Sequence, residues 1–522
     1  MSRPVTIRFR PMAIAAPRPA PRAHPLARRS VPLVMALGGV IACGGKEAPP
    51  PAASAPAPTI AAIDSLVAES MRDGKVPGMS VTIVRNDSVI HSKGYGLANL
   101  EQQRPMTDST PVVIGSTSKT ITAFAIMQLV DSGKVALDST VPHYLALLGA
   151  PTAAGTQVAK ATPVDPRFNA ITVRHLLTNV SGIPAGFAGE PFDVLDTATT
   201  ALEALARDDM LTRPLDFAPG KGYTYSNRGF SLASLVVQDA SGLSYEDYIN
   251  SRIFAPLGMR HSTGRFWEGP SRGMVQGYRE SVDGKPVVSA PALGRGHTGS
   301  GMILSTSRDI GQFLRAILNG GRAADGTQLL SAASTAELLR AQQPAESELG
   351  GPTTYALGWE VHDLNGVPMI MKGGSVISMG SLFVMLPQQK IGIAMLINDV
   401  DYGKLQLLQN VVKHLLGAPT TPYGAAPAAA PVAATGYRAT PERLRDVAGE
   451  YMTRAGLMRV TLRGDTVAAR YEGRDVILEP ASDSSFIMRS VIRDQEGHLV
   501  TIKRCGTTMC AWMEGDSSAV KR

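Results

Sequence analysis

Cysteine, aromatic residues and metal-ligand patterns are all scarce in this sequence of 522 residues. It contains three cysteines and nine histidines, and 5% of its residues are aromatic. No histidine stands in a His-Glu-x-x-His or comparable pattern, and Cys505 and Cys510 alone cannot make a zinc site. We therefore expect no metal. The 44% of hydrophobic residues, with no collagen or coiled-coil repeat, indicates globular domains.

An excess of one charge is also missing from most of the chain. The net charge of +7 comes from the first 42 residues, which hold seven arginines and no acidic residue. The remaining residues include 44 basic and 44 acidic ones. A neutral chain has no electrostatic footprint for a polyanion, so we expect no nucleic-acid partner. The seven arginines are Arg3, Arg8, Arg10, Arg18, Arg22, Arg28 and Arg29.

The apolar run near the N-terminus is too short to span a bilayer. It covers residues 31–41 and follows Arg28 and Arg29, which is typical of a signal peptide. The run ends at Val40-Ile41-Ala42-Cys43-Gly44, which resembles a bacterial lipobox. That resemblance implies that residues 1–42 are removed and that Cys43 carries a lipid anchor to the bacterial membrane. The alternative is an ordinary signal peptide with a free cysteine, and both interpretations predict export to the cell envelope or periplasm.

Two segments rich in alanine and proline divide the rest of the chain. They cover residues 43–59 and 418–439, and such a composition stays extended and forms no core. We interpret the first as a tether and the second as a linker. They delimit a body at 60–417 and a small domain at 440–522.

The body combines the patterns of helices and strands. Segments 79–84 and 88–93 are rich in β-branched residues and flank a short turn, which predicts a hairpin. Apolar residues recur at helical spacing from Ile121 to Val130, and Gly133 ends the pattern. Further strands are predicted at 367–371, 381–386 and 391–397. These elements indicate an α/β (α+β) body with an antiparallel sheet flanked by helices.

The C-terminal segment predicts a small all-β domain. Its strand-like runs are divided by glycine and aspartate, which is typical of a small barrel or sandwich. Cys505 and Cys510 have four residues between them, a spacing that suits a disulfide across a hairpin turn in an oxidising compartment. The runs cover 457–462, 467–471, 486–489, 499–503 and 511–514.

Ser116 and Lys119 are the first candidate catalytic pair. They follow Gly115 just before the helix-like run, so a helix would place both side chains on one side, one turn apart. A serine hydroxyl becomes a nucleophile when a neighbouring base takes its proton, which a lysine can do. A Ser-x-x-Lys pattern alone is expected by chance in so long a chain, and Ser518 to Lys521 is such a match.

Tyr225 and Asn227 are the second candidate pair. A phenol can carry protons, and an amide can hold a substrate carbonyl. The same pattern at 248–250 lies in an amphipathic stretch, and we interpret it as core packing.

Lys372 opens the third motif, Lys372-Gly373-Gly374-Ser375, at the end of a strand-like run. Its glycines let a substrate backbone approach closely, and its cation could bind a carboxylate. A similar pattern at 390–392 lies in a continuous apolar strand, which favours a structural role.

Ser-x-x-Lys, Tyr-x-Asn and Lys-x-Gly in this order are the signatures of the serine β-lactamase and penicillin-binding protein superfamily. The chain most resembles the class C β-lactamase-like branch, which includes D,D-peptidases, esterases and D-amino-acid peptidases. Similar segments lie at 76–79, 171–178, 181–184, 256–259 and 299–302. The resemblance implies a β-lactamase-like body with an appended β-domain.

The resemblance also implies the catalytic roles. Ser116 would be the acylated nucleophile, Lys119 its base or proton relay, and Tyr225 a second proton carrier. The backbone N–H groups of Ser116 and Ser375 would form the oxyanion hole. Such a mechanism implies that no cofactor is needed.

The binding roles follow in the same way. Asn227 would orient the substrate amide, and Lys372 would support Tyr225 or bind a substrate carboxylate beside Gly374. Lys372 favours a carboxylate-bearing substrate, whereas Gly373 lacks the hydroxyl that often binds that carboxylate in relatives.

The expected function is therefore a cell-envelope serine hydrolase that acts through an acyl-enzyme on an amide, β-lactam or ester. Two alternatives stay open. One is a small-ester or D-amino-peptide hydrolase without β-lactamase activity, and the other is a non-catalytic penicillin-binding-like sensor. The acyl donor, the rate of deacylation and the role of the C-terminal domain stay undecided at this point.

Overall fold

The computed structural model describes most of the chain between residues 59 and 521. The predicted signal peptide, Cys43 and nearly all of the predicted tether lie outside the described residues. The gaps are 151–159, 185–196, 281–284, 290–293, 347–351, 365, 377, 400–403, 421–435, 454–455, 464–465, 472–473, 490–498, 506–507 and 514–518.

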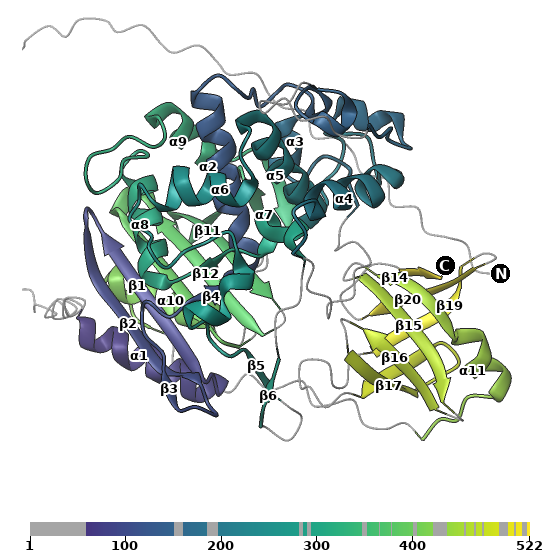
Figure 1. The fold of residues 1–522 in the computed structure, drawn as a ribbon. Coiled ribbons are helices and arrows are strands. Elements are labelled where there is room, and N and C mark those ends of the chain that lie inside the picture. The colour runs from purple at the N-terminus through teal and green to yellow at the C-terminus, as the bar shows by residue number, and fades with distance from the viewer. Residues whose placement is uncertain are drawn as a thin grey trace, which may run out of the picture. The chain divides into compact units, whose positions relative to one another are not determined.

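A nine-stranded antiparallel sheet forms the centre of the body (Figure 1). Its strand order is β3-β2-β1-β13-β12-β11-β10-β9-β8, so the first long strand of the body pairs with the last one. The strands β1, β12 and β13 are buried along nearly their whole length, as expected for strands covered on both faces. The strands are β1 (Gly78–Arg85), β2 (Ser88–Asn99), β3 (Arg104–Pro105), β8 (Gln343–Glu346), β9 (Pro352–Tyr355), β10 (Glu360–Leu364), β11 (Val367–Val376), β12 (Met379–Leu386) and β13 (Ile391–Ile397).

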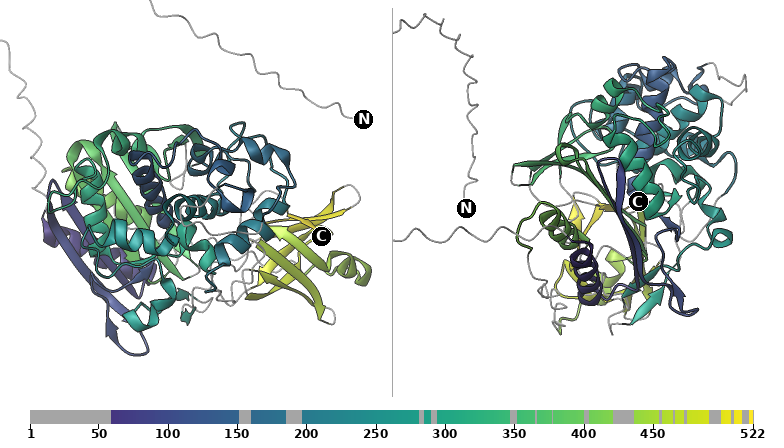
Figure 2. Two further views of the ribbon diagram at one scale, coloured as in Figure 1. Left: turned by 45° about the horizontal axis from the view of Figure 1, so that its top comes forward. Right: turned by 90° about the vertical axis from the view of Figure 1, so that its left-hand side faces the viewer.

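Helices cover both faces of this sheet, as the further views in Figure 2 show. On one face α1 (Ile60–Gly74) and α10 (Lys404–Leu415) share an apolar core with the strands. On the other face α2 (Ser118–Asp131), α5 (Asn227–Ser241) and α8 (Ser307–Leu318) belong to a larger core. The predicted antiparallel sheet with flanking helices is therefore confirmed.

Shorter elements complete the body. The helices are α3 (Val173–Leu177), α4 (Ala201–Asp208), α6 (Tyr245–Ile249), α7 (Thr298–Gly301) and α9 (Ala332–Leu339). Two small antiparallel pairs join β4 (Val112–Val113) to β7 (Leu304–Ser305) and β5 (Tyr278–Glu280) to β6 (Pro286–Val288).

Helix α2 is buried along its first ten residues. Every residue from Ser118 to Met127 is buried, which is the pattern of a helix surrounded by protein. The short 3₁₀ helix η1 (Gly115–Thr117) precedes α2, so Ser116 lies at the start of the helix. Gly133, which the sequence predicts as the stop, has a φ of 70° just beyond the C-terminal cap.

Strands β14 to β21 close into an antiparallel barrel that follows α11 (Pro441–Val447). Tyr451, Phe486 and Met488 are fully buried in its core. The predicted all-β domain is confirmed, and it is a barrel rather than a sandwich. The strands are β14 (Gly449–Thr453), β15 (Gly456–Arg463), β16 (Thr466–Tyr471), β17 (Arg474–Pro480), β18 (Ser485–Arg489), β19 (Leu499–Cys505), β20 (Thr508–Met513) and β21 (Ala519–Lys521).

The two cysteines of the barrel lie on neighbouring strands. Cys505 pairs with Thr508, and Cys510 pairs with Lys503 in the β19–β20 hairpin. The register therefore gives the cysteines diagonal positions, and their disulfide stays a prediction.

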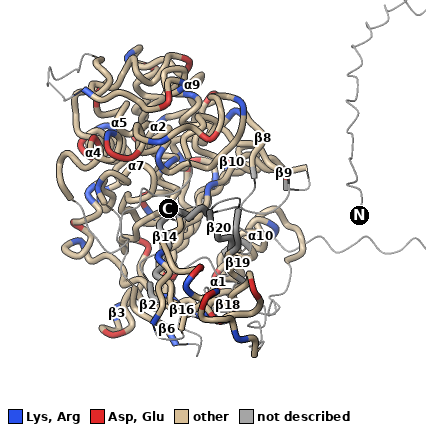
Figure 3. The backbone as a smooth tube through the Cα atoms, turned by 90° about the vertical axis from the view of Figure 1, so that its right-hand side faces the viewer, with Lys and Arg blue, Asp and Glu red and all other residues tan. Residues whose placement is uncertain are grey.

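Basic and acidic residues are interspersed along the described backbone in Figure 3, which agrees with the balanced composition. No helix in the described part of the chain is long and apolar enough to cross a membrane. Among the same residues, no three His, Cys, Asp or Glu side chains gather in a group that could hold a metal ion.

Candidate active site

A tightly packed backbone holds Ser116 at the start of α2. Its side chain is partly exposed, whereas its neighbours Gly115 and Thr117 are buried. Gly115 has a φ of 55°, and a Cβ at this position would lie 2.6 Å from the backbone N of Ser375. Only glycine fits such a conformation and such an approach without strain. The glycine therefore brings the backbone of Ser116 next to β11.

Lys119 lies one turn after Ser116 and is completely buried. Its Nζ is 3.2 Å from Ser116 Oγ, 2.6 Å from Asn227 Oδ1 and 2.6 Å from the carbonyl oxygen of Ser300. As an ammonium, Lys119 can donate to all three acceptors. As a neutral amine, it can keep the two short bonds and turn its lone pair to Ser116. The geometry therefore allows Lys119 to accept the proton of the serine.

Ser300 belongs to α7, within the segment 299–302 that resembles the superfamily. The sequence did not predict a contact with Lys119, because Ser300 contributes a main-chain oxygen that any residue carries. The helix reaches Lys119 because α7 packs against both α2 and α5. Asn227, which the sequence did predict as a site residue, is the first residue of α5.

Tyr225 lies close to both lysines of the site. Its ring centroid is 4.8 Å from Lys119 Nζ and 4.9 Å from Lys372 Nζ. Two ammonium groups at this distance stabilise negative charge on a phenol oxygen. This is the charge that Tyr225 would carry after it gives up its proton.

Asn179 holds the segment that carries Tyr225. Its Oδ1 accepts a bond from the N–H of Ser226 at 3.1 Å, and its carbonyl oxygen accepts from Thr224 at 2.9 Å. Asn179 has a φ of 59°, a conformation that asparagine tolerates better than most residues. The Ser226 side chain then caps α5 by accepting the N–H of Gly229 at 3.0 Å. No local pattern in the sequence points to Asn179, because its partners lie more than 40 residues away.

Lys372 forms a buried ion pair that the sequence did not predict. Its Nζ is 2.8 Å from Glu360 Oε1, and the two side chains are only 1% and 2% exposed. Glu360 Oε2 lies 3.2 Å from His362 Nε2. Strand β10 carries Glu360 and His362 antiparallel to β11, so the pair depends on the sheet register. A carboxylate twelve residues away gives no motif by which to recognise it.

Tyr223 and Tyr355 complete the surroundings of Tyr225 and Lys372. Their ring centroids are 6.1 Å apart. Burial raises the pKa of Tyr223 well above its usual value, and the positive charge of Lys372 only partly offsets this. Burial likewise raises the pKa of Tyr355 far above the usual range of a phenol. Both tyrosines therefore stay neutral near pH 7.

Strand β11 lies directly against η1 beside the nucleophile. A Cβ at Gly374 would lie 2.3 Å from the Ile114 oxygen and 2.8 Å from the Thr117 nitrogen. Ser381 on β12 reinforces this contact, because its Oγ donates to the same Ile114 oxygen at 2.6 Å. The N–H groups of Ser116 and Ser375 thus belong to two segments in backbone contact, as an oxyanion hole requires.

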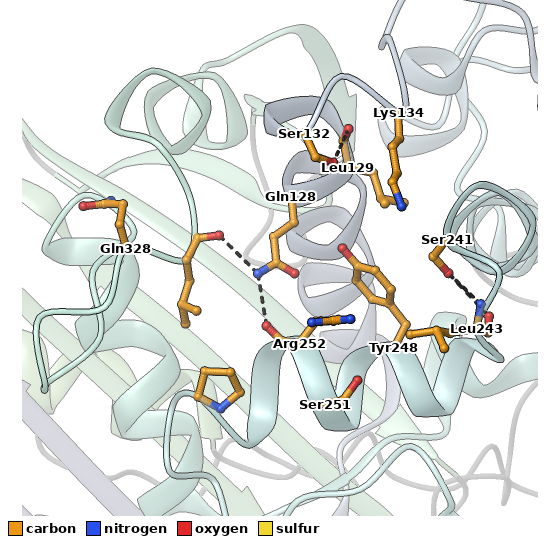
Figure 4. Close-up of a pocket in the computed structure, with 12 residues that line it drawn as sticks. Gln128, Leu129, Ser132, Lys134, Ser241, Leu243, Tyr248, Ser251, Arg252 and Gln328 are labelled. Carbon is orange, nitrogen blue, oxygen red and sulfur yellow. Dashed lines mark hydrogen bonds between the residues drawn. The ribbon is translucent and has the colours of Figure 1, made fainter. Parts of the chain in front are cut away.

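A pocket with a cavity volume of about 420 Å³ lies at the other end of α2 (Figure 4). Gln128 of α2, Ser132 just beyond its end, Tyr248 of α6 and Arg252 line it. None of the candidate catalytic residues does so. Tyr248 belongs to the second Tyr-x-Asn pattern, which therefore stands apart from Ser116, as the sequence interpretation expects.

The structure thus brings the seven predicted site residues of the body together. Their chemical roles stay predictions, and the predicted lipidation site Cys43 lies outside the described residues. The seven are Ser116, Lys119, Tyr225, Asn227, Lys372, Gly374 and Ser375.

Comparisons with known proteins address the family of the chain. Residues 63–418 match the family model described as Beta-lactamase. The chain is 27% identical over 342 residues to protein flp of Staphylococcus aureus (strain MW2), a match that covers 64% of this chain and 62% of that protein. The chain therefore spans less than two thirds of the length of this relative. It is also 28% identical over 329 residues to penicillin-binding protein 4 of Amycolatopsis lactamdurans, covering 62% of this chain and 81% of that protein.

Solved structures show the same fold. An octameric penicillin-binding protein homologue from Pyrococcus abyssi superposes with a TM-score of 0.57 at 25% identity, covering 88% of this chain and 100% of that one. A class C beta-lactamase superposes with a TM-score of 0.54 at 23% identity, covering 69% of this chain and 96% of that one. The family match covers more than half of the sequence and confirms the resemblance. The chain belongs to the beta-lactamase family, within the superfamily of serine β-lactamases and penicillin-binding proteins.

Proposed function

We propose that this protein is a serine hydrolase that acts through an acyl-enzyme on Ser116, with an amide, β-lactam or ester as acyl donor. Members of its superfamily are generally serine hydrolases. The observation that carries the proposal is the contact of Lys119 Nζ with Ser116 Oγ at 3.2 Å, close to Tyr225. A nucleophile, a base and a second proton carrier are thus within reach of one another.

The proposed acylation starts with a neutral Lys119. Ser116 Oγ attacks the carbonyl carbon while its proton passes to Lys119 Nζ, so a carbon–oxygen bond forms and Lys119 becomes an ammonium. The carbonyl oxygen gains negative charge, which the N–H groups of Ser116 and Ser375 stabilise. The bond to the leaving group then breaks, and Tyr225 gives that group its proton.

A proton transfer between Lys119 and Tyr225 restores both side chains after acylation. The Tyr225 phenolate takes a proton from the Lys119 ammonium, whose Nζ is 4.8 Å from the ring centroid. Both side chains are then neutral again. In deacylation the neutral Lys119 takes the proton of Tyr225, and the resulting phenolate removes a proton from the attacking water. The water oxygen bonds to the acyl carbon, the bond from that carbon to Ser116 Oγ breaks, and Ser116 Oγ takes a proton from the Lys119 ammonium, 3.2 Å away. Both Lys119 and Tyr225 are then neutral.

Intact-mass spectrometry of the protein mixed with a penicillin and with a chromogenic ester tests this proposal. We expect the wild type to form a covalent adduct with at least one of these donors, and we expect Ser116→Ala to form none. Ser132→Ala, an exposed serine at the far end of α2, serves as the matched control and should keep the adduct. Hydrolysis by Ser116→Ala at the wild-type rate would disprove the role of Ser116.

We also propose that the protein is exported and anchored in the cell envelope through Cys43. The support is the arginine-flanked apolar run and the lipobox-like segment that ends at Cys43. Labelling with a fatty-acid analogue in a bacterial host tests this. Cys43→Ser should lose the label, and Cys505→Ser should retain it. An unlabelled wild-type protein would contradict the lipid anchor.

A further inference from the structure

The positive charge of Lys372 is already balanced by a carboxylate of the protein itself. Its ammonium contacts Glu360 at 2.8 Å, and the residue as a whole is 0% exposed. A substrate carboxylate that used Lys372 would have to compete with a carboxylate that is covalently part of the site. Such a fixed partner is always present and needs no loss of translational freedom.

Glu360 cannot easily swing away from Lys372. Its second oxygen lies 3.2 Å from His362 Nε2, and the His362 ring lies within 3.4 Å of Thr353 Oγ1. Thr353 Oγ1 in turn donates to the carbonyl oxygen of Val361 at 2.8 Å. The buried carboxylate is therefore held from both sides by strands β9, β10 and β11.

Lys372 also faces the catalytic phenol. Its Nζ is 4.9 Å from the ring centroid of Tyr225 and 5.8 Å from that of Tyr355. An ammonium over aromatic rings gains favourable cation–π energy without a solvent contact. These contacts indicate that Lys372 acts on Tyr225, which was one of the two roles implied by the sequence, rather than on a substrate anion.

The two residues that follow Lys372 on β11 offer no second cation. Gly373 and Gly374 have no side chain, and position 374 has no room for one, because a Cβ would lie 2.3 Å from the Ile114 oxygen. Lys119 must be neutral when it accepts the proton of Ser116. At that moment the charges of Lys372 and Glu360 cancel, so these three groups carry no net charge.

We propose that Glu360 is a specificity-determining residue that makes this site select acyl donors with no carboxylate beside the scissile bond, namely neutral esters and amides. This inference rests on the proposed acyl-enzyme function and narrows its substrate class. A β-lactam, which carries a carboxylate next to the reactive amide, becomes a poor donor. Removal of the Glu360 charge should release the Lys372 cation toward anionic donors.

A pair of substrates that differ only in one carboxylate tests the inference. The phenyl ester and the 3-carboxyphenyl ester of N-(phenylacetyl)glycine share the same acyl group, and only the second leaving group is charged. We measure kcat/KM for both and divide each by the alkaline hydrolysis rate of that ester, which removes the difference in intrinsic reactivity. The wild type should prefer the neutral ester at least tenfold.

Three variants then test whether Glu360 causes the preference for the neutral ester. Glu360→Gln should lower the preference for the neutral ester at least tenfold, and Glu360→Asp, which keeps the charge, should retain most of it. Glu268→Gln breaks an exposed ion pair with Arg272 and should leave both rates unchanged. A purely structural role of Glu360 would lower both rates alike and leave their ratio unchanged.

The results of these assays distinguish a failure of the acyl-enzyme proposal from a failure of the inference on Glu360. Hydrolysis that survives in Ser116→Ala would overturn the acyl-enzyme function itself. Hydrolysis that depends on Ser116, but with a wild-type preference for the charged ester, would overturn only the inference on Glu360. This second outcome needs no Glu360 variant, so the inference stays testable even where Glu360→Gln does not fold. A ratio that is unchanged in a folded Glu360→Gln would also overturn it.

Discussion

Asn179 takes no part in the proposed chemistry, yet it fixes the backbone on both sides of Tyr225. It is 1% exposed, and it binds Ser226 through its side chain and Thr224 through its carbonyl oxygen. Asn179→Gly keeps the left-handed conformation but removes the side-chain bond. We expect kcat to fall roughly 10- to 100-fold through misplacement of Tyr225, with a smaller change in KM. Steady-state kinetics with the neutral ester measures both.

Two controls isolate that hydrogen bond. Asn179→Asp keeps an oxygen acceptor for the Ser226 N–H and should retain more activity than Asn179→Gly. Asn86→Gly changes another asparagine with a positive φ, in the turn after β1, and should leave kcat unchanged. Equal activity of Asn179→Gly and the wild type would show that Asn179 does not position Tyr225.

Asp239 gives a pH-dependent prediction. Burial raises its pKa to about 6, although a bond from the Ala146 N–H at 2.8 Å works in the opposite direction. The folded state therefore binds a proton more tightly than the unfolded state, whose pKa is near 3.8. The protonated carboxyl of Asp239 therefore stabilises the folded state below about pH 4, and this stabilisation is lost as the pH rises through 6.

Asp239→Asn removes this titration while it keeps an oxygen acceptor. We expect the variant to be more stable than the wild type at pH 7 to 8, by at most about 3 kcal/mol for a two-unit shift. The advantage should disappear near pH 4. Urea unfolding at a series of pH values measures the difference, and a constant difference across this range would contradict the assignment.

The residues that the sequence could identify are those whose chemistry follows from a local motif. Ser116 and Lys119 are separated by one helical turn, and Tyr225 and Asn227 flank the start of α5. Glu360, Asn179 and Tyr355 are common residue types without such spacing. Only the sheet register and the loop contacts bring them to the site, so no pattern in the sequence predicts them.

At the scale of elements, the contact between β11 and η1 sets the site geometry. Gly374→Ala would force a Cβ to within 2.3 Å of the Ile114 oxygen, so one of the two backbones must shift. That shift would move the N–H of Ser375 relative to that of Ser116. We expect kcat to fall at least about 100-fold, which is the usual effect of losing one oxyanion donor. The acylation rate in a stopped-flow assay reports this step.

Gly301→Ala is the matched control for that prediction. Its Cβ would lie 3.8 Å from the carbonyl carbon of Gly115, an ordinary contact distance, and Gly301 is part of α7. It adds the same methyl group to α7, which also packs against η1. If both variants lose activity equally, the close approach of β11 is not the cause.

The sequence predicted which elements exist, but it made no prediction of their order in the sheet. The continuous apolar runs of β12 and β13 and the buried pattern of α2 are local signals of period and composition. The position of β13 between β1 and β12 depends on pairing across the whole body. Composition cannot encode this order, because several apolar strands could exchange places without changing the pattern.

At the scale of the whole molecule, the body and the barrel each have an apolar core of their own. Phe486 is completely buried in the barrel and Phe124 in the body. We expect two transitions in calorimetry of the full chain. Phe486→Ala should lower the temperature of one transition, and Phe124→Ala should lower that of the other. Each substitution should reduce the free energy of unfolding of its own part by about 3–5 kcal/mol. A single transition that both variants lower together would contradict separate cores.

Because β1 pairs with β13, it must wait for its partner strand during synthesis. About 300 residues separate the end of β1 from its partner strand. At about 5–20 residues per second, a ribosome needs roughly 15–60 seconds to supply that partner. Until then the β1–β2 hairpin has an apolar edge that can join another nascent chain. Premature termination would therefore yield aggregates rather than a smaller enzyme, and newly made chains should depend on a chaperone that holds this hairpin.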